Sequence, residues 1–187
     1  MSTSIDVYPA NGQMPLIEQT RARTEELFQL VLNRHCIGVR VSVNAYHATG
    51  SQREVSSSTR WSPGMRIGFG YSIDGGLGSS SWPTCYVIDD ADRITDSDLY
   101  SADRPFGVAS EFLGAWNVIP DLSEILDADL LAAIGASSHY WSDYRNAGAS
   151  AVVSTGYGLA AAALAEATNG VVASYDGAFA RTDGAWG

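Results

Sequence analysis

The strongest constraint on the fold is an alternation of β-branched residues in the first quarter of the chain. Residues 37–43 alternate isoleucine or valine with smaller or polar side chains, and this period of two is typical of a strand with one buried face. The preceding residues, 17–34, are charged first and apolar later, and they predict a helix that starts shortly after Pro15. A helix followed closely by such a strand indicates a fold that combines helices with a sheet.

The rest of the chain extends this mixed pattern. Further strands are expected at 4–8, 66–73, 85–88, 171–175 and 178–180, and further helices at roughly 107–116, 122–134 and 159–168. Asn169 and Gly170 are expected to end the last helix in a left-handed cap, while residues 137–145 fit either a strand or a helix. We therefore predict a single α+β domain over residues 1–187, in which about four helices pack on a mostly antiparallel mixed sheet.

The size and the cysteine content indicate an ordinary core. A chain of 187 residues, 45% of them hydrophobic, is long enough to fold without disulfides or metals. Cys36 and Cys85 lie in apolar runs and are expected to be buried, reduced thiols. The first residues lack the charged and apolar regions of a secretory leader, and no run approaches the ~18 apolar residues of a membrane span. The expected location is the cytoplasm, without a membrane partner.

The acidity of the chain is concentrated in one stretch. Residues 89–129 hold 11 acidic residues and two arginines, a net charge of −9 out of the formal −10 of the whole chain. A negative field repels the phosphate backbone of nucleic acids and attracts a basic protein. The alternative interpretation is a solvated, helix-rich segment that only aids solubility. We place the candidate partner-binding surface on six aspartates: Asp89, Asp90, Asp92, Asp96, Asp98 and Asp103.

Motifs for catalysis and for metal binding are incomplete. The glycine-rich stretch 74–81 is not followed by the lysine that a phosphate-binding loop needs, because the chain contains no lysine. The sequence around Ser72 lacks the last glycine of a nucleophile elbow. An EF-hand loop started at Asp90 would have Thr95 and Ser101 where glycine and glutamate are required. The sequence thus assigns no cofactor, no metal ligand and no catalytic residue.

Two other classes of function remain open. The first is a small enzyme whose cleft is lined by tryptophan and tyrosine, with His47 or His139 paired to an aspartate as a general base. The second is a structural subunit of a phage or another assembly. The oligomeric state follows from none of these patterns.

The last helix and the residues after it carry a resemblance. Residues 165–178 read as a helix end, a strand and an Asp-Gly turn at 176–177. This stretch resembles the close of small bacterial immunity proteins of polymorphic toxin systems. The resemblance implies a protein-binding inhibitor of the immunity or antitoxin type, which would mask a basic toxin with the acidic surface.

Overall fold

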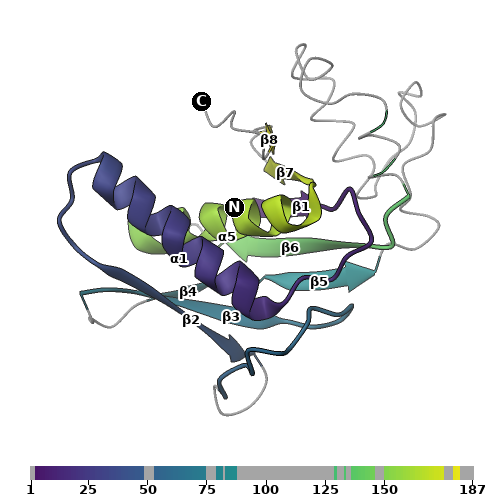
Figure 1. Ribbon diagram of the computed structural model, residues 1–187, viewed down its shortest axis with the longest axis horizontal. Helices are drawn as coiled ribbons and strands as arrows, with labels where there is room; N and C mark the ends of the chain where they lie inside the picture. Colours follow the sequence, from purple (N-terminus) through teal and green to yellow (C-terminus); the bar gives the residue numbers. More distant parts are fainter. Residues whose placement is uncertain are drawn as a thin grey trace.

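The computed structural model describes seven stretches of the chain (Figure 1). They are residues 3–48, 53–74, 79–81, 83–87, 136–145, 150–174 and 179–181, together with Asp129 and Ala133. Within them, ten helices and strands form an α+β architecture whose strand pairs are all antiparallel.

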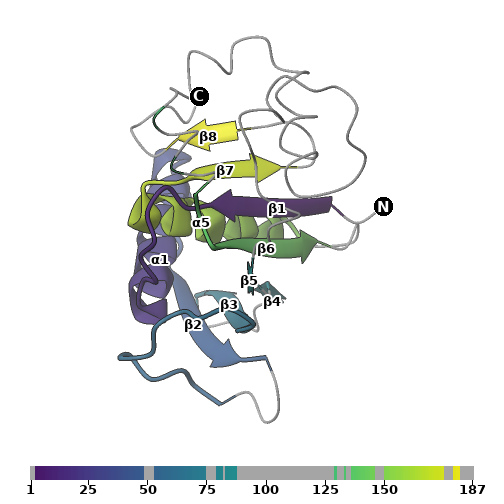
Figure 2. The ribbon, with the colours of Figure 1, turned by 90° about the vertical axis from the view of Figure 1, so that its right-hand side faces the viewer.

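The larger sheet gathers strands from both ends of the described chain (Figure 2). Its order is β5-β6-β1-β7-β8. The bounds of these strands are β1 Thr3–Tyr8, β5 Thr84–Val87, β6 His139–Arg145, β7 Val171–Ser174 and β8 Phe179–Arg181. The first strand therefore lies in the middle, where Val7 is opposite Trp141 of β6 on one side and Val172 of β7 on the other.

The smaller sheet is connected to the larger one by its central strand. It consists of β2 (Val41–His47), β3 (Ile67–Ile73) and β4 (Ser79–Ser81), in that order. Just before β3, the chain pairs with β5 through an Arg66–Thr84 bridge, and the Cys85 amide donates to the Met65 carbonyl at 2.9 Å. One continuous segment thus leaves the edge of the larger sheet and becomes the centre of the smaller one.

Two helices pack against these sheets. In α1 (Ile17–Arg34), the buried face consists of Ile17, Thr20, Thr24, Phe28 and Leu32. These positions follow the helical period. The Thr24 hydroxyl donates to the Thr20 carbonyl at 2.7 Å, so that this buried hydroxyl has a hydrogen-bond partner inside the core. The helix contacts β2 and the second helix.

The second helix, α5 (Ala151–Thr168), contacts both sheets as well as α1. Ser150 caps its start by accepting a hydrogen bond from the Val153 amide at 3.4 Å, and Asn169 ends it in the left-handed conformation with φ 51°. Buried alanines at 160–163 and 165 allow a close approach to the strands. The strand that follows needs a residue without a Cβ at Gly170, because a Cβ there would overlap the Tyr8 carbonyl oxygen.

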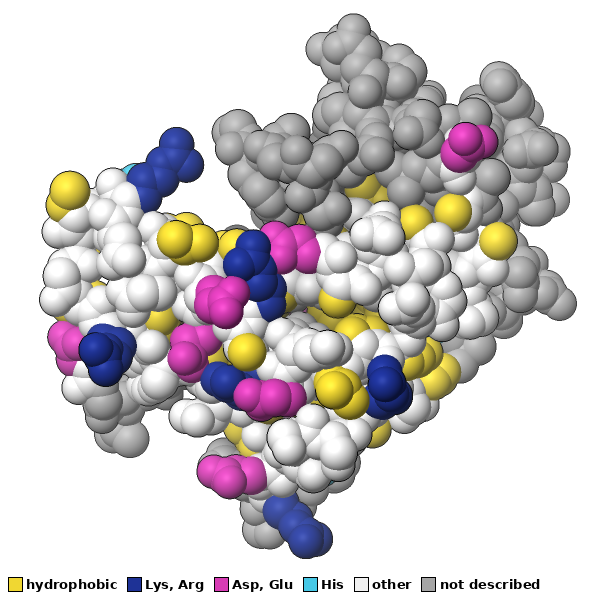
Figure 3. All heavy atoms as spheres, in the orientation of Figure 1, with side chains coloured by type: hydrophobic (Ala, Val, Ile, Leu, Met, Phe, Trp, Pro, Cys, Tyr) yellow, Lys and Arg dark blue, Asp and Glu magenta, His cyan; other side chains and the backbone are white. Residues whose placement is uncertain are grey.

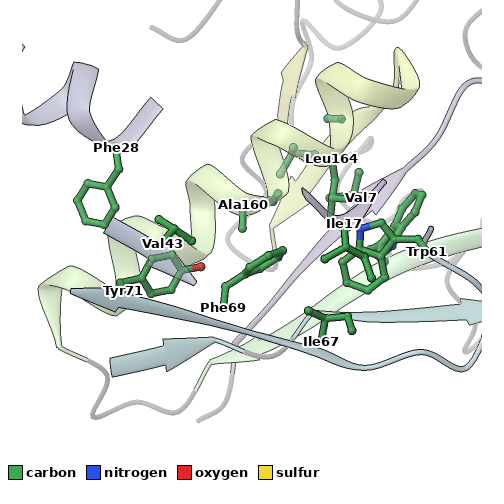
Figure 4. Packing of buried hydrophobic residues seen from close by; sticks show 14 of the residues in the cluster. Val7, Ile17, Phe28, Val43, Trp61, Ile67, Phe69, Tyr71, Ala160 and Leu164 are labelled. Atoms are coloured by element: carbon green, nitrogen blue, oxygen red, sulfur yellow. The ribbon is translucent and has the colours of Figure 1, made fainter. Parts of the chain in front are cut away.

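The core lies between α5, α1 and the two sheets (Figure 4). Side chains from β3, including Phe69 and Ile67, point toward Leu164 and Ala160 of α5 in that view. Trp61 and Trp141 meet edge to face, with ring centroids 6.2 Å apart and exposed fractions of 1%. Burial of apolar surface contributes roughly 25 cal/mol per Å² to the free energy of folding. This aromatic cluster is therefore a main source of stability.

The first part of the free edge of β2 is covered by side chains of α1, while its end pairs with residues after the strand through a Tyr46–Glu54 bridge. The Val43 amide donates to Glu25 Oε2 at 2.9 Å, and the Val43 carbonyl accepts from Arg21 at 2.8 Å. One turn further along, Gln29 accepts from the Val41 amide at 3.2 Å and donates to the Val39 carbonyl at 3.0 Å. These helix residues, spaced four apart, complete the hydrogen bonding that an exposed edge strand would lack.

Most of the expected elements are confirmed. The helix over 17–34 is present with those bounds, the segment 137–145 contains a strand, and the two strands after α5 pair with each other. The described residues contain two helices and not four, since the helices expected at 107–116 and 122–134 fall almost entirely outside them. The helix expected at 159–168 starts eight residues earlier, at Ala151, where Ser150 supplies the cap.

Two details of the prediction are wrong. The strand expected from residue 37 begins at Val41, because residues 35–40 first carry the chain out of α1 and back toward β2. For the same reason Cys36 is exposed, in a left-handed conformation with φ 55°, and only Cys85 is the buried thiol that was expected. Both cysteines are free, and burial raises the pKa of the Cys85 thiol to about 12, so that this thiol is unreactive.

Candidate functional site

The six aspartates of the predicted partner-binding surface lie outside the described residues. They are Asp89, Asp90, Asp92, Asp96, Asp98 and Asp103, all of the acidic segment 89–129. One acid of that segment, Asp129, is described and is exposed to solvent. The placement of this surface therefore stays a prediction from the sequence.

The histidines considered for catalysis are in different environments. His139 on β6 is 1% exposed and packs its ring edge to face on Trp141, with centroids 4.8 Å apart. Its Nδ1 lies 3.3 Å from the Ser138 hydroxyl, and burial lowers its pKa below the ordinary value of 6.5. His47 is half-buried at the end of β2. Neither imidazole forms an ion pair with a carboxylate within the part of the chain that the structure describes.

The described tryptophans are core residues. Trp61 and Trp141 are both buried in the hydrophobic cluster, and the Trp61 indole donates to the Thr20 hydroxyl at 3.2 Å. Tyr71 is also fully buried, and its hydroxyl lies 2.6 Å from the Ser81 hydroxyl. The cleft that an aromatic-lined enzyme site requires is therefore not formed by these three residues, which instead hold α1, β3 and β6 together.

A polar hollow opens where α1, α5 and the segment before α1 meet. Its volume is about 530 Å³, a size at which a small ligand or a few residues of a peptide would fit. We call it the Arg60 hollow. It is lined by Gln13, Met14, Pro15, Gln19, Arg23, Arg60, Ala163, Glu166 and Ala167.

One of the two arginines in the Arg60 hollow is neutralised. Arg23 of α1 forms a two-point ion pair with Glu166 of α5, with nitrogen to oxygen distances of 2.5 and 3.1 Å. A third bond, at 3.0 Å, joins Arg23 to Glu26. The bonds to Glu166 and Glu26 raise the pKa of Arg23 further above its ordinary value, so it stays charged, and each of its three nitrogens donates to a carboxylate.

The other arginine is held in place by backbone contacts. Arg60 donates from one guanidinium nitrogen to the Met14 carbonyl at 3.0 Å. Its backbone is fixed from both sides, because the Ile17 amide donates to the Thr59 carbonyl at 2.9 Å and the Trp61 amide donates to the Pro15 carbonyl at 3.0 Å. Among the described residues, no carboxylate forms an ion pair with this guanidinium.

Charges of opposite sign are interleaved on the face shown in Figure 3. On α1, Arg21 lies between Glu18 and Glu25, at 2.8 and 2.9 Å, and its hydrogen bond lowers the pKa of the Glu18 carboxyl. The described acids and bases of α1 thus largely compensate one another. Two large apolar side chains are exposed nearby in the sequence, Leu30 at 57% and Ile37 at 44%.

The described residues contain no group of three or more histidine, cysteine, aspartate or glutamate side chains placed to hold a metal ion. In the same residues, no helix combines the length and the apolar character that crossing a membrane requires. The Arg60 hollow was missed by the sequence reasoning, because its lining comes from three separate parts of the chain and carries no local motif.

Comparison of the chain with protein-family models, with curated proteins and with solved structures gives no match.

Proposed function

We propose that this chain is a protein-binding inhibitor of the immunity or antitoxin type, and that it masks a basic partner protein with the acidic segment 89–129. The observation that carries the proposal is the distribution of charge. This segment has a net charge of −9 in 41 residues, while the remaining 146 residues hold 10 acids and nine arginines. Such a contrast favours steering of a basic partner toward one part of the molecule.

The described part of the chain is consistent with this division of roles. Its charged residues on α1 are largely used within the fold, in the pairs Arg21–Glu18, Arg21–Glu25 and Arg23–Glu166. Exposed pairs of this kind contribute only about 0–1 kcal/mol each, but they leave little unbalanced charge on the helix. The acids of segment 89–129 have too few arginines among them for such pairing, which favours an external basic partner.

The test uses the protein encoded beside this chain in its native genome as the candidate partner. Both proteins are purified, and their affinity is measured at low and at high salt. We expect binding that weakens as salt is added, because screening reduces attraction between exposed charges. We also expect that co-expression of this chain relieves growth inhibition by the partner.

The variants separate the acidic segment from general charge effects. Asp96→Asn with Asp98→Asn removes two charges from the segment, and the matched control Glu26→Gln with Glu54→Gln removes two exposed charges elsewhere. The segment variant should bind at least about fivefold more weakly, mainly through slower association, and the control should bind like the parent chain. Equal affinities of the two variants, or a partner without a basic surface, would rule the proposal out.

A further inference from the structure

The Arg60 hollow offers a second binding surface, separate from the acidic segment. Its lining comes from α1, α5, residues 13–15 and Arg60, all of which are described, and includes Ala163 and Ala167. The two alanines, with Met14 and Pro15, give it an apolar part that would contact the aliphatic stem of a side chain.

The net charge of the lining determines whether the hollow favours a negatively or a positively charged ligand. Among the lining residues, Glu166 is engaged by Arg23, so that this pair contributes no net charge; Glu26, which also pairs with Arg23, is not part of the lining. Arg60 therefore provides the uncompensated charge of the lining, and its one hydrogen bond to the Met14 carbonyl leaves further N–H groups for a ligand. A guanidinium with two free N–H groups matches the two oxygens of a carboxylate.

The same lining is a poor match for an anion with more than one negative charge. A phosphate would carry close to two negative charges, and one uncompensated arginine beside the Glu166 carboxylate is a weak match for it. A single carboxylate balances the excess charge of one. The hollow is thus better suited to a carboxylic acid side chain than to phosphate or to nucleic acid.

Side-chain amides in the lining could form hydrogen bonds to a peptide backbone. Gln19 uses its oxygen to accept from the Leu16 amide at 3.1 Å, which turns its NH₂ group into a donor fixed at the first turn of α1. Gln13 is exposed at the entrance to α1 and is also part of the lining. Amide groups of this kind donate to the carbonyl oxygens of an extended chain.

The backbone of Arg60 is fixed before any ligand binds. Its neighbour Trp61 is 1% exposed, and the backbone on both sides of Arg60 is hydrogen-bonded to residues 15–17. The Arg60 side chain thus extends from a fixed backbone, and its bond to the Met14 carbonyl holds one guanidinium nitrogen, so it loses less conformational entropy on binding than an arginine on a free loop. We propose that the Arg60 hollow binds an acidic peptide segment of a partner protein, with a glutamate or aspartate carboxylate on Arg60 and the peptide backbone on Gln19.

The experiment uses the full chain and two short peptides. The probe is the acetylated and amidated pentapeptide Ala-Ala-Glu-Ala-Ala, and the control peptide has Gln in place of Glu. Side-chain NMR signals of Arg60 Nε and of the Gln19 amide are followed during titration to millimolar concentration. We expect saturable shifts of both signals with the Glu peptide and about tenfold weaker binding of the Gln peptide.

Two variants make the result specific to the hollow. Arg60→Gln removes the proposed contact. Arg40→Gln removes another exposed arginine, whose backbone amide and carbonyl both bond to Asp74 within the described residues. Affinity for the Glu peptide should fall about tenfold in the first variant and stay unchanged in the second. Thermal unfolding of both variants shows whether each remains folded.

Several outcomes would overturn this inference. They are the absence of shifts at Arg60 and Gln19, an equal response to the Glu and Gln peptides, and equal affinities of the two arginine variants. Stronger saturation of the same signals by inorganic phosphate would identify a site for small anions instead. None of these results depends on Asp96 or Asp98, so the failure of this inference and the failure of the proposed function are distinguishable.

Discussion

Gly156 lies where α5 approaches the ring of Tyr71. A Cβ built on this glycine would be 2.5 Å from two atoms of that ring, far inside van der Waals contact. The ring has no room to retreat, because Tyr71 is fully buried and its hydroxyl is 2.6 Å from the Ser81 hydroxyl. By contrast, a Cβ on Gly158, two residues further along the helix, would meet no atom within 4 Å.

The two glycines are therefore expected to respond to alanine in opposite directions. Gly156→Ala should lower the free energy of unfolding by about 1–3 kcal/mol through overpacking. Gly158→Ala should raise it by about 0.5–1 kcal/mol, since alanine favours a helix interior. Urea denaturation of both variants measures the difference. A stable Gly156→Ala variant would mean that α5 and β3 are not packed as described.

His139 gives the fold a dependence on pH. Burial lowers its pKa in the folded chain below the value of 6.5 that it takes when unfolded. Above that value both states are neutral and the full stability is present. As the pH falls below it, the unfolded chain binds a proton first, so stability is lost until the lower folded pKa is passed.

Replacing this histidine should flatten that part of the pH profile. Between about pH 7 and about pH 5, the free energy of unfolding of the parent chain should decrease, by at most ~1.4 kcal/mol per pH unit from this one group. His139→Phe should lose less stability over the same range than the parent chain. Denaturation at a series of pH values measures the free energy of unfolding of each protein. If it changes equally with pH in the parent chain and in His139→Phe, His139 is not the source of the pH dependence.

At the scale of elements, α1 has two roles. Its buried face packs into the core, and its side chains Arg21, Glu25 and Gln29 complete the hydrogen bonds of the β2 edge. An edge strand without such cover is a template for another strand of a second molecule. The helix thus closes the first part of this edge of the smaller sheet, and the Tyr46–Glu54 bridge covers its end.

Gln29→Leu should open that edge. It removes the bonds to the Val41 amide and the Val39 carbonyl, and we expect a loss of about 1–2 kcal/mol in the free energy of unfolding. Hydrogen exchange at the Val41 amide should accelerate, and light scattering should detect self-association. Glu26→Gln on the same helix, which faces Arg23 and not β2, serves as the control. Unchanged exchange at Val41 would show that the edge is protected in another way.

The sequence predicted those elements whose patterns are local. The 17–34 helix has a helical period of its own, and the Asn169 cap has a residue type that adopts positive φ readily. The first eight residues of α5 were missed, because Gly156 and Gly158 weaken a helical pattern that here depends on packing against Tyr71. The three-residue strand β4 was also missed, since its order comes from pairing with β3.

The candidate site was less predictable than the fold. Nothing near Arg60 in the sequence indicates that its guanidinium lies beside residues of α5, roughly 100 positions later. The choice between strand and helix at 137–145 was undecidable for a similar reason, because β6 is defined by its partners β1 and β5. Long-range pairing leaves little trace in a local pattern.

Over the whole chain, the excess negative charge and the described helices and strands lie in different segments. In the described residues, the charges of α1 are largely compensated by one another and by Glu166, whereas the excess acids of the chain belong to segment 89–129. A partner attracted by that segment and an acidic peptide on Arg60 would use surfaces of opposite sign. A protein that offered both a basic and an acidic contact would then be distinguished from one that is merely basic.

The central place of β1 determines when the larger sheet can be completed. Both neighbours of β1 are made late, β6 from residue 139 onward and β7 from residue 171 onward. At a typical synthesis rate of ~5–20 residues per second, roughly 10 to 30 seconds pass between the emergence of β1 and that of β7. Both edges of β1 are unpaired until β6 has been made, and one edge stays unpaired until β7 follows, so β1 is open to wrong pairing for much of synthesis.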